Sequence, residues 1–226
     1  MDMLFSSDIA NASLTDWHQL AQGLHARFLV ADFRTAANFI SAIADEESGH
    51  FPKVSLGDGY VDLKLISVDA IYHENETTDH IVEWVTQKDI EAARLISAIA
   101  ARHGLSADPD AVSVVELGLD VTKSGIVAPV WAALLTGDPA SQGHGSPSDE
   151  IRDASGRVPN LWFGDFEESD PPGQRFHIEV YVSAAEGRRR IAAAVAAGGT
   201  IVDSANSPNL TVIADQDGNR GVVCVQ

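Results

Sequence analysis

The stretch FLVADFRTAANFISAIADEESGHFP, residues 28–52, carries the pattern that decides the fold of the first half of the chain. Asp32 is placed to cap a helix over residues 33–47, because an aspartate oxygen accepts hydrogen bonds from first-turn amides. This helix has an apolar stripe at three- and four-residue spacing, formed by Ala36, Phe39, Ile40 and Ile43. Residues 27–31 favour a short strand before it. The stretch therefore predicts a strand followed by an amphipathic helix.

The residues after this helix predict a hairpin and a second helix. Residues 57–59, Gly-Asp-Gly, are a turn signal. Residues 60–68, YVDLKLISV, alternate between apolar and polar side chains, which is typical of a half-buried antiparallel strand. A helix is predicted over residues 87–103, where Thr86 and Asp89 have the spacing of a capping box.

The residues before the decisive stretch give a weaker pattern. Residues 1–13 are expected to be loose, and a helix is predicted from Leu14 because apolar residues recur at helical spacing up to Leu24. Together these elements predict an α+β domain over residues 14–104, with an antiparallel sheet and helices on one face.

The second half of the chain predicts two βαβββ modules in tandem over residues 111–226, after a linker at residues 105–110. The first module begins with the strand SVVELGLDV and continues with a helix that contains Trp131. The second has the strand RFHIEVYV, the helix AEGRRRIAAAVAA and three further strands. A repeated order of elements is the signature of an internal duplication.

Composition excludes several classes of function. The formal net charge is -18, with 17 acidic and 7 basic residues up to Asp108 and 16 and 8 after it. An acidic chain without a basic stripe is not expected to bind nucleic acid or an anionic membrane. The single cysteine, Cys224, fits a reducing compartment, and the N-terminus has no signal-peptide pattern, so we expect a cytoplasmic protein.

The first hundred residues resemble the pterin-4a-carbinolamine dehydratases. The resemblance rests on the phrase in residues 28–47, on Trp17 and on the residues that match the family motif; these are Glu46, His50, Pro52, Tyr60 and Asp89. It implies dehydration of a 4a-hydroxytetrahydropterin, with His50 as the proton-transferring residue and with Glu46 and Asp89 orienting it. The chemistry needs a base for the N5 proton and an acid for the departing hydroxyl, and an imidazole can be either. The resemblance implies no metal and no other cofactor, and it implies a homo-oligomer.

The chain departs from the family motif at two positions. Phe51 replaces the second histidine of the motif, and Ser67-Val68 stands where the family has Thr-His. A phenyl ring cannot move protons, so the activity is expected to be weakened or repurposed. The polar insert HENETTDH, residues 73–80, brings His73 and His80, and we expect at least His73 to fold back toward the ligand together with Phe51, Pro52 and Tyr60.

Each of these residues also has a structural explanation. Asp89 is fully accounted for as a capping residue, and His50 before a proline could simply close a helix. Three functions therefore stay open. The chain is a lyase acting on a 4a-hydroxypterin, a binding protein for a pterin-like or cationic small molecule, or a protein whose first domain mainly drives oligomerisation.

Residues 112–226 resemble the glyoxalase and bleomycin-resistance (vicinal oxygen chelate) superfamily. The phrases NLWFGDF, RFHIEVYV and VIADQDGNRGVVCV carry the resemblance. It implies a divalent metal held by one residue from the first strand and one carboxylate from the last strand of each module. Superposing the repeats pairs Glu116 with His177, but the closing positions at residues 162–163 and 223–224 offer no carboxylate. We therefore predict no metal and assign Glu116 and His177 to ligand binding.

Overall fold

The computed structural model describes residues 1–46, 49–121, 124–125, 128, 132, 151, 159–165, 176–196, 198–214 and 220–226. The backbone forms two compact units, Met1–Val112 with Gln226, and Ser113–Val225.

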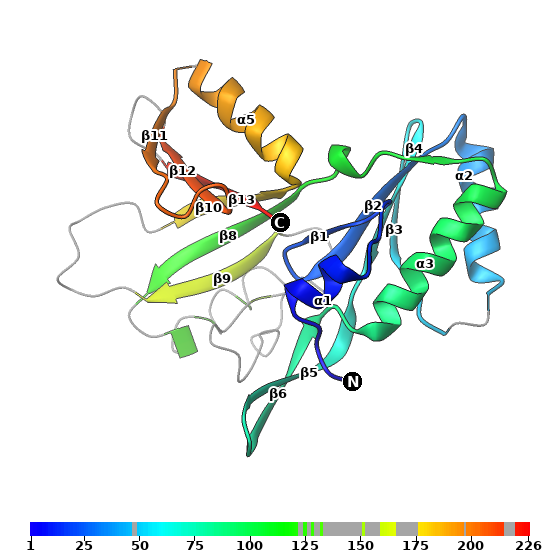
Figure 1. Cartoon of the computed structure of the whole chain (residues 1–226), viewed down its shortest axis with the longest axis horizontal. Helices are drawn as coiled ribbons and strands as arrows, with labels where there is room; N and C mark the ends of the chain where they lie inside the picture. Colours follow the sequence, from blue (N-terminus) through cyan, green and yellow to red (C-terminus); the bar gives the residue numbers. More distant parts are fainter. Residues whose placement is uncertain are drawn as a thin grey trace. The chain divides into compact units, whose positions relative to one another are not determined.

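The first unit is built on an antiparallel sheet. Its strands, in the order β1-β2-β4-β3 across the sheet, are β1 (His18–Leu20), β2 (Gly23–Leu29), β4 (Tyr60–Leu65) and β3 (Lys53–Gly57). The short strand β7 (Ser106–Ala107) also pairs with β2, and a 3-10 turn, η1 (Pro109–Ala111), follows it. Helices α2 (Phe33–Ala44) and α3 (Gln87–Arg102) cover one face of this sheet (Figure 1). The predicted α+β fold with helices on one face of an antiparallel sheet is thus confirmed.

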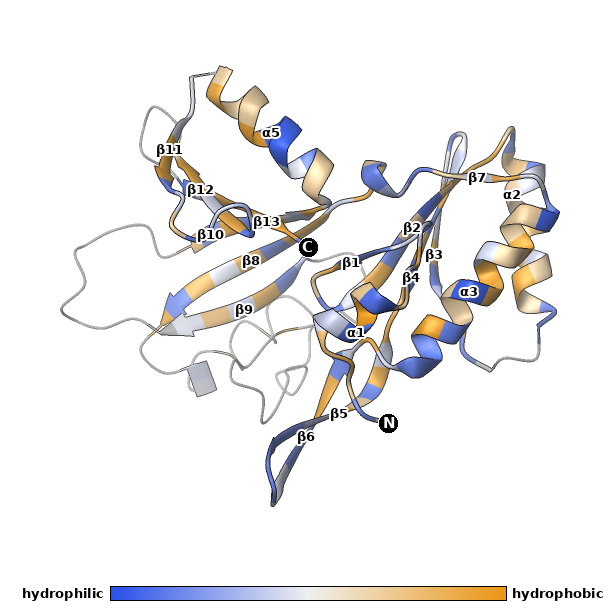
Figure 2. Cartoon of the chain, in the orientation of Figure 1, coloured by the Kyte–Doolittle hydropathy of each residue, from blue (hydrophilic) through white to orange (hydrophobic). Residues whose placement is uncertain are grey.

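The core of the first unit lies between this sheet face and the two helices. Alternate residues of β2 and β4 point into it, as the alternation in residues 60–68 predicts. Phe28 of β2 packs edge-on against Phe39 of α2, with ring centroids 5.3 Å apart. The apolar sides of α2 and α3 appear as orange bands on the ribbon in Figure 2. Asp32 caps α2 as predicted, because its Oδ1 accepts from the Thr35 amide at 2.7 Å.

The predicted helix at residues 14–24 is wrong. The segment forms β1 and the start of β2, joined by a tight turn at Ala21, which has a φ of 52°. Leu20 and Leu24 are both buried, so their four-residue spacing reflects two paired strands rather than one helix face. Burial along β2 does not alternate, because Gly23, Leu24, His25 and Ala26 are all buried.

A hairpin formed by β5 (Ser67–Asn75) and β6 (Thr78–Trp84) extends from the sheet as a separate two-stranded ribbon (Figure 1). It includes the polar insert. The N-terminal segment, expected to be loose, lies along it: the Met3 amide donates to Ile71 O at 3.0 Å and the Ile71 amide to Met1 O at 2.9 Å. The short helix α1 (Ser6–Asn11) follows.

The second unit contains a sheet with the order β11-β12-β13-β10-β8-β9. Its strands are β8 (Val114–Val121), β9 (Asn160–Asp165), β10 (Phe176–Val182), β11 (Thr200–Asp203), β12 (Leu210–Ala214) and β13 (Arg220–Val225). With α5 (Ala184–Ala196), the last four of these in chain order form a complete βαβββ module, as predicted. The first and last strands of each module pair in parallel, β8 with β9 and β10 with β13. The predicted helix around Trp131 lies outside the described residues.

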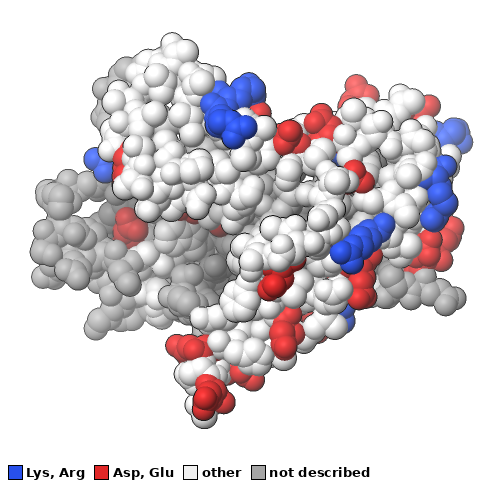
Figure 3. Space-filling view, viewed as in Figure 1, with Lys and Arg blue, Asp and Glu red and all other residues white. Residues whose placement is uncertain are grey.

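The surface is rich in carboxylates. Acidic side chains gather along the β5–β6 hairpin, whereas blue cationic groups form scattered small patches (Figure 3). No helix in the described part of the chain has the length and apolar character needed to cross a membrane.

Candidate functional site

Asp89, in the first turn of α3, is the centre of the site in the first unit. Its side chain is fully buried. Its Oδ2 accepts from the Thr86 backbone amide at 2.8 Å and from the Thr86 hydroxyl at 3.0 Å. These bonds, with the reciprocal bond of the capping box, fix the start of α3. The capping role predicted for Asp89 is therefore present.

Ser67, at the start of β5, is a further hydrogen-bond donor to this carboxylate. Its hydroxyl donates to Asp89 Oδ2 at 2.8 Å and lies 2.8 Å from the Thr86 hydroxyl. Both hydroxyl residues are buried. Oδ2 of Asp89 thus accepts from three donors, which are the Thr86 amide, the Thr86 hydroxyl and the Ser67 hydroxyl. From the sequence, Ser67 was identified only as a departure from the family motif. In the structure, its hydroxyl donates a hydrogen bond to the carboxylate of Asp89.

His50 completes the cluster. Its Nε2 lies 2.7 Å from Asp89 Oδ1, and 22% of its side chain is exposed. A carboxylate that contacts one ring nitrogen fixes the orientation of an imidazole. The structure therefore brings His50 and Asp89 into direct contact.

Glu46 takes part in a different contact. It lies just beyond the end of α2, where it forms an ion pair with Arg102 at 3.2 Å, near the end of α3. This surface contact links the ends of two helices. The proposed orienting role of Glu46 finds no support in this geometry.

The two positions where the chain departs from the family motif directly follow His50 and Ser67 in the sequence. Phe51 follows His50 and is 52% exposed, and Val68 follows Ser67 and is 64% exposed. Pro52 lies next to Phe51 and is partly buried. His50 and Ser67, which both contact Asp89, are thus each followed in the sequence by an exposed apolar residue.

Tyr60 belongs to a cluster on the sheet. Its ring lies under the Arg27 guanidinium, 3.8 Å from ring centroid to Cζ, and Arg27 makes two 2.6 Å bonds to Asp62. These three side chains come from the paired strands β2 and β4. The contacts show a packed structural aromatic, which was the alternative explanation of Tyr60.

The histidines of the insert pair with carboxylates nearby. His73 Nδ1 lies 2.6 Å from Asp79 Oδ1 and its Nε2 lies 3.4 Å from Asp2, and these partners raise the pKa of His73. His80 Nε2 lies 3.0 Å from Glu74. Both histidines lie on the β5–β6 hairpin, and their carboxylate partners are Asp79, Asp2 and Glu74.

A second polar cluster lies on one face of the C-terminal sheet. Glu116 of β8 stands directly opposite Glu179 of β10, and only 2% of Glu116 is exposed. Asn160 Nδ2 donates to Glu116 at 3.2 Å, and His177 Nε2 lies 3.6 Å from Glu179. The carboxylate of Glu179 raises the pKa of His177.

Glu179 was missed in the sequence, although a signal was available. The alternation in RFHIEVYV places His177, Glu179 and Tyr181 on the same face of the strand. Glu179 Oε2 accepts from Tyr181 Oη at 2.8 Å and from Trp162 Nε1 at 3.1 Å. Burial opposes its ionisation, but these donors and His177 lower the pKa of Glu179 below its ordinary value.

Comparison with known proteins agrees with both resemblances. Residues 4–99 match the family described as pterin 4 alpha carbinolamine dehydratase, and residues 116–224 match the glyoxalase-like domain. A protein from Thermosynechococcus vestitus, which carries pterin-4-alpha-carbinolamine dehydratase as its provisional name, is 32% identical over 91 residues. The match covers 39% of this chain and 83% of that protein.

Two solved structures are also similar. One is described as a transcriptional coactivator/pterin dehydratase from Brucella melitensis, with 28% identity, a TM-score of 0.36 and coverage of 44% of this chain and 99% of the other. The other is described as an NAD-dependent benzaldehyde dehydrogenase from Legionella pneumophila, with 13% identity, a TM-score of 0.38 and coverage of 49% and 97%. These TM-scores are too low for either structure to support a functional inference.

The sequence prediction of two fused families is confirmed by the two family matches. The chain belongs to the pterin-4a-carbinolamine dehydratase family through residues 4–99, and it carries a glyoxalase-like domain at residues 116–224.

Proposed function

We propose that the N-terminal domain dehydrates a 4a-hydroxytetrahydropterin, with His50 as the general acid and base and Asp89 as its positioning partner. The 2.7 Å contact between His50 Nε2 and Asp89 Oδ1 carries the proposal, because it supplies an oriented imidazole beside a buried carboxylate. The proposed place of action is the cytoplasm, with a pterin-like small molecule as the ligand.

One imidazole is sufficient if it acts in two steps. Protonated His50 donates a proton to the C4a hydroxyl, the C4a–O bond breaks and water leaves. The electron pair of N5 forms the C4a=N5 double bond, which leaves N5 positively charged. Neutral His50 then takes the N5 proton, so the imidazolium is restored and the dihydropterin is released. Asp89 stabilises the imidazolium before the first step and after the second.

The experiment compares the full chain with a variant in which Phe51→His and Val68→His restore the family histidines. Decay of chemically generated 4a-hydroxytetrahydropterin is followed with excess protein and without protein. Because both positions are exposed and directly follow His50 and Ser67 in the sequence, we expect the native chain to exceed the spontaneous rate and the double variant to exceed the native chain. A double variant no faster than the spontaneous reaction would contradict the proposal.

A binding role is the second candidate, and exposed Phe51 and Val68 favour it. Apolar side chains in place of imidazoles offer contact area to a planar ligand without proton transfer. Under this alternative an unreactive pterin raises the melting temperature of the chain, while decay of the hydroxypterin stays at the spontaneous rate.

Assembly is the third candidate, and strand β3 favours it. It is at the edge of the sheet and exposes Val54 and Leu56. An exposed apolar edge strand can pair with a second chain. We expect a homo-oligomer by light scattering, and Val54→Lys should lower its mass toward that of a monomer.

A further inference from the structure

The glyoxalase-like domain raises the question whether its residues fit a divalent metal. Glu116 and His177 stand at the two first-strand positions that the resemblance assigns to metal ligands. At the last-strand positions, β9 supplies Trp162 and β13 supplies the buried thiol of Cys224. An indole N–H is a donor only and cannot bind a metal. Within the described ranges, no group of three or more His, Cys, Asp or Glu side chains is arranged to hold a metal ion.

The nearest additional carboxylate, Glu179, is engaged by neighbouring donors. Oε2 accepts from Tyr181 and from Trp162, and Oε1 lies 3.6 Å from His177 Nε2. The ring nitrogen of His177 that faces the cluster is therefore directed at a carboxylate. A metal ligand must present a lone pair to the metal. The donor set described here does not fit a divalent metal.

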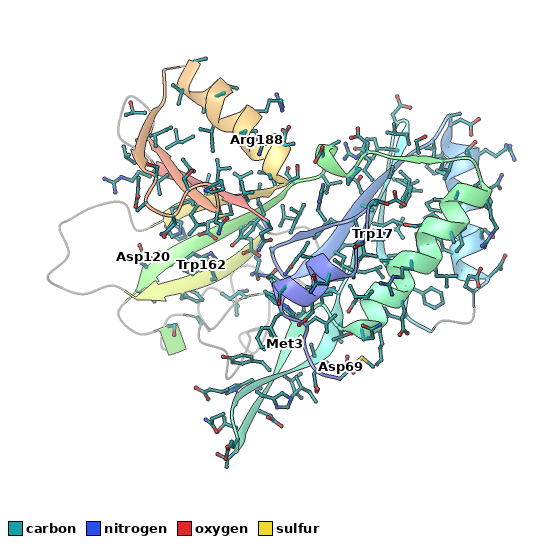
Figure 4. All side chains as sticks on the ribbon, in the orientation of Figure 1. Met3, Trp17, Asp69, Asp120, Trp162 and Arg188 are labelled. Atoms are coloured by element: carbon teal, nitrogen blue, oxygen red, sulfur yellow. The ribbon has the colours of Figure 1, made fainter. Side chains whose placement is uncertain are left out.

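Gly118 makes this arrangement possible. In the sheet, β8 lies between β10 and β9, so the indole of Trp162, which Figure 4 labels, must cross β8 to reach Glu179. A Cβ at Gly118 would lie 2.5 Å from His177 Nε2 and 2.9 Å from Trp162 Cζ2. The two rings meet edge to face above this glycine, with centroids 5.2 Å apart. A side chain at position 118 would separate them.

We propose that the C-terminal domain holds no divalent metal at the Glu116 and His177 positions, and that a hydrogen-bonded Glu179 is the charged centre there. Glu179 joins β10 to β9 through Trp162, across the space that Gly118 leaves on β8. The inference is independent of the proposed dehydratase activity, because it concerns only residues of the C-terminal domain.

The first test is metal binding by the full chain. Protein treated with a chelator is titrated with Zn²⁺, Ni²⁺ and Mn²⁺, and bound metal is measured by elemental analysis alongside the melting temperature. We expect the native chain, His177→Gln and Glu116→Gln to give the same metal content and no metal-dependent rise in melting temperature. One metal per chain that is lost in either variant would overturn the proposal, whereas metal that both variants retain lies elsewhere and agrees with it.

The second test addresses the hydrogen bond from Trp162 to Glu179 across β8. It compares Gly118→Ala with a matched control, Gly221→Ala. A Cβ at Gly221, on β13 of the same sheet, would meet nothing closer than 3.7 Å. The readout is the indole N–H resonance of Trp162, assigned with Trp162→Phe. We expect Gly118→Ala to shift this resonance and lower the melting temperature by roughly 5 °C, and Gly221→Ala to change neither. An unchanged Trp162 resonance in Gly118→Ala would contradict the proposed hydrogen bond from Trp162 to Glu179 across β8.

Discussion

The two carboxylate oxygens of Asp89 have different partners: one caps helix α3 and the other contacts His50. Oδ2 accepts from Thr86 and Ser67 and so closes the start of α3, whereas Oδ1 holds His50. Because the side chain is fully buried, every lost partner leaves an unpaired polar group away from water. The capping function and the proposed catalytic function are therefore properties of the same side chain.

Replacing this carboxylate by an amide tests how much it stabilises the fold. Asp89→Asn removes a buried charge and turns an amino group toward donors, so we expect the free energy of unfolding to fall by about 3 kcal/mol. Asp79→Asn, at an exposed ion pair of the hairpin, should lower it by less than about 1 kcal/mol. Urea unfolding measures both. Equal losses in the two variants would refute the central position of Asp89.

His25 makes the fold sensitive to acid. It is buried on β2, its Nε2 has no hydrogen-bond partner in the part of the chain that the structure describes, and burial, aided by Lys64, lowers its pKa from 6.5 to about 3. Between these pH values the unfolded chain binds a proton that the folded chain excludes. The contribution of His25 is therefore full above pH 6.5 and is lost as the pH falls toward 3.

Replacing His25 should remove this sensitivity. Across the window, stability should fall by up to about 1.4 kcal/mol per pH unit more steeply in the native chain than in His25→Gln. Gln87→Ala, at an exposed residue that does not titrate, is the control and should keep the native slope. Urea midpoints at several pH values give the slopes, and parallel curves for His25→Gln and the native chain would exclude this account.

At the scale of elements, the sequence predicts those whose pattern is local. The helix stripes of α2 and α3 and the alternation of β4 are all present, because side chains of one element decide which face is buried. Strand β1 and the start of β2 were predicted as a helix, since the turn at Ala21 rests on pairing between strands rather than on a Gly or Pro signal. The N-terminal segment was expected to be loose because it is short and polar, but it pairs with β5, which is distant in sequence.

The β5–β6 hairpin depends on that N-terminal segment. The Leu4 amide donates to Val85 O at 2.8 Å and Trp84 Nε1 donates to Leu4 O at 2.8 Å, beside the bonds between Met3 and Ile71. Removing one donor should let the hairpin open locally without unfolding the core.

Met3→Pro is the corresponding test, because proline lacks the amide that bonds Ile71 O. Hydrogen exchange of the hairpin amides should quicken by roughly tenfold. Amides in the middle of α3, in the same sample, should keep their protection. Unchanged exchange in β5 would show that the hairpin is stable by itself.

At the scale of the whole molecule, motifs identified both families, but they did not identify the contacts within each site. His50 and Asp89 were predicted from the motif, and the structure places them in contact. The contacts of Ser67 with Asp89 and of Trp162 with Glu179 join residues that are distant in sequence, so no local pattern shows which atoms meet. The contact of Thr86 with Asp89 is local, and its spacing predicted it. Glu46 was predicted from the same motif to orient His50, but in the structure it forms an ion pair with Arg102.

The rate of hydroxypterin dehydration by the full chain, measured beside His50→Ala and the control His80→Ala, tests the central claim most directly. The account predicts that the native chain and the control exceed the spontaneous rate equally, and that His50→Ala loses about a hundredfold or all of the acceleration. A His50→Ala variant that is as fast as the native chain would contradict it.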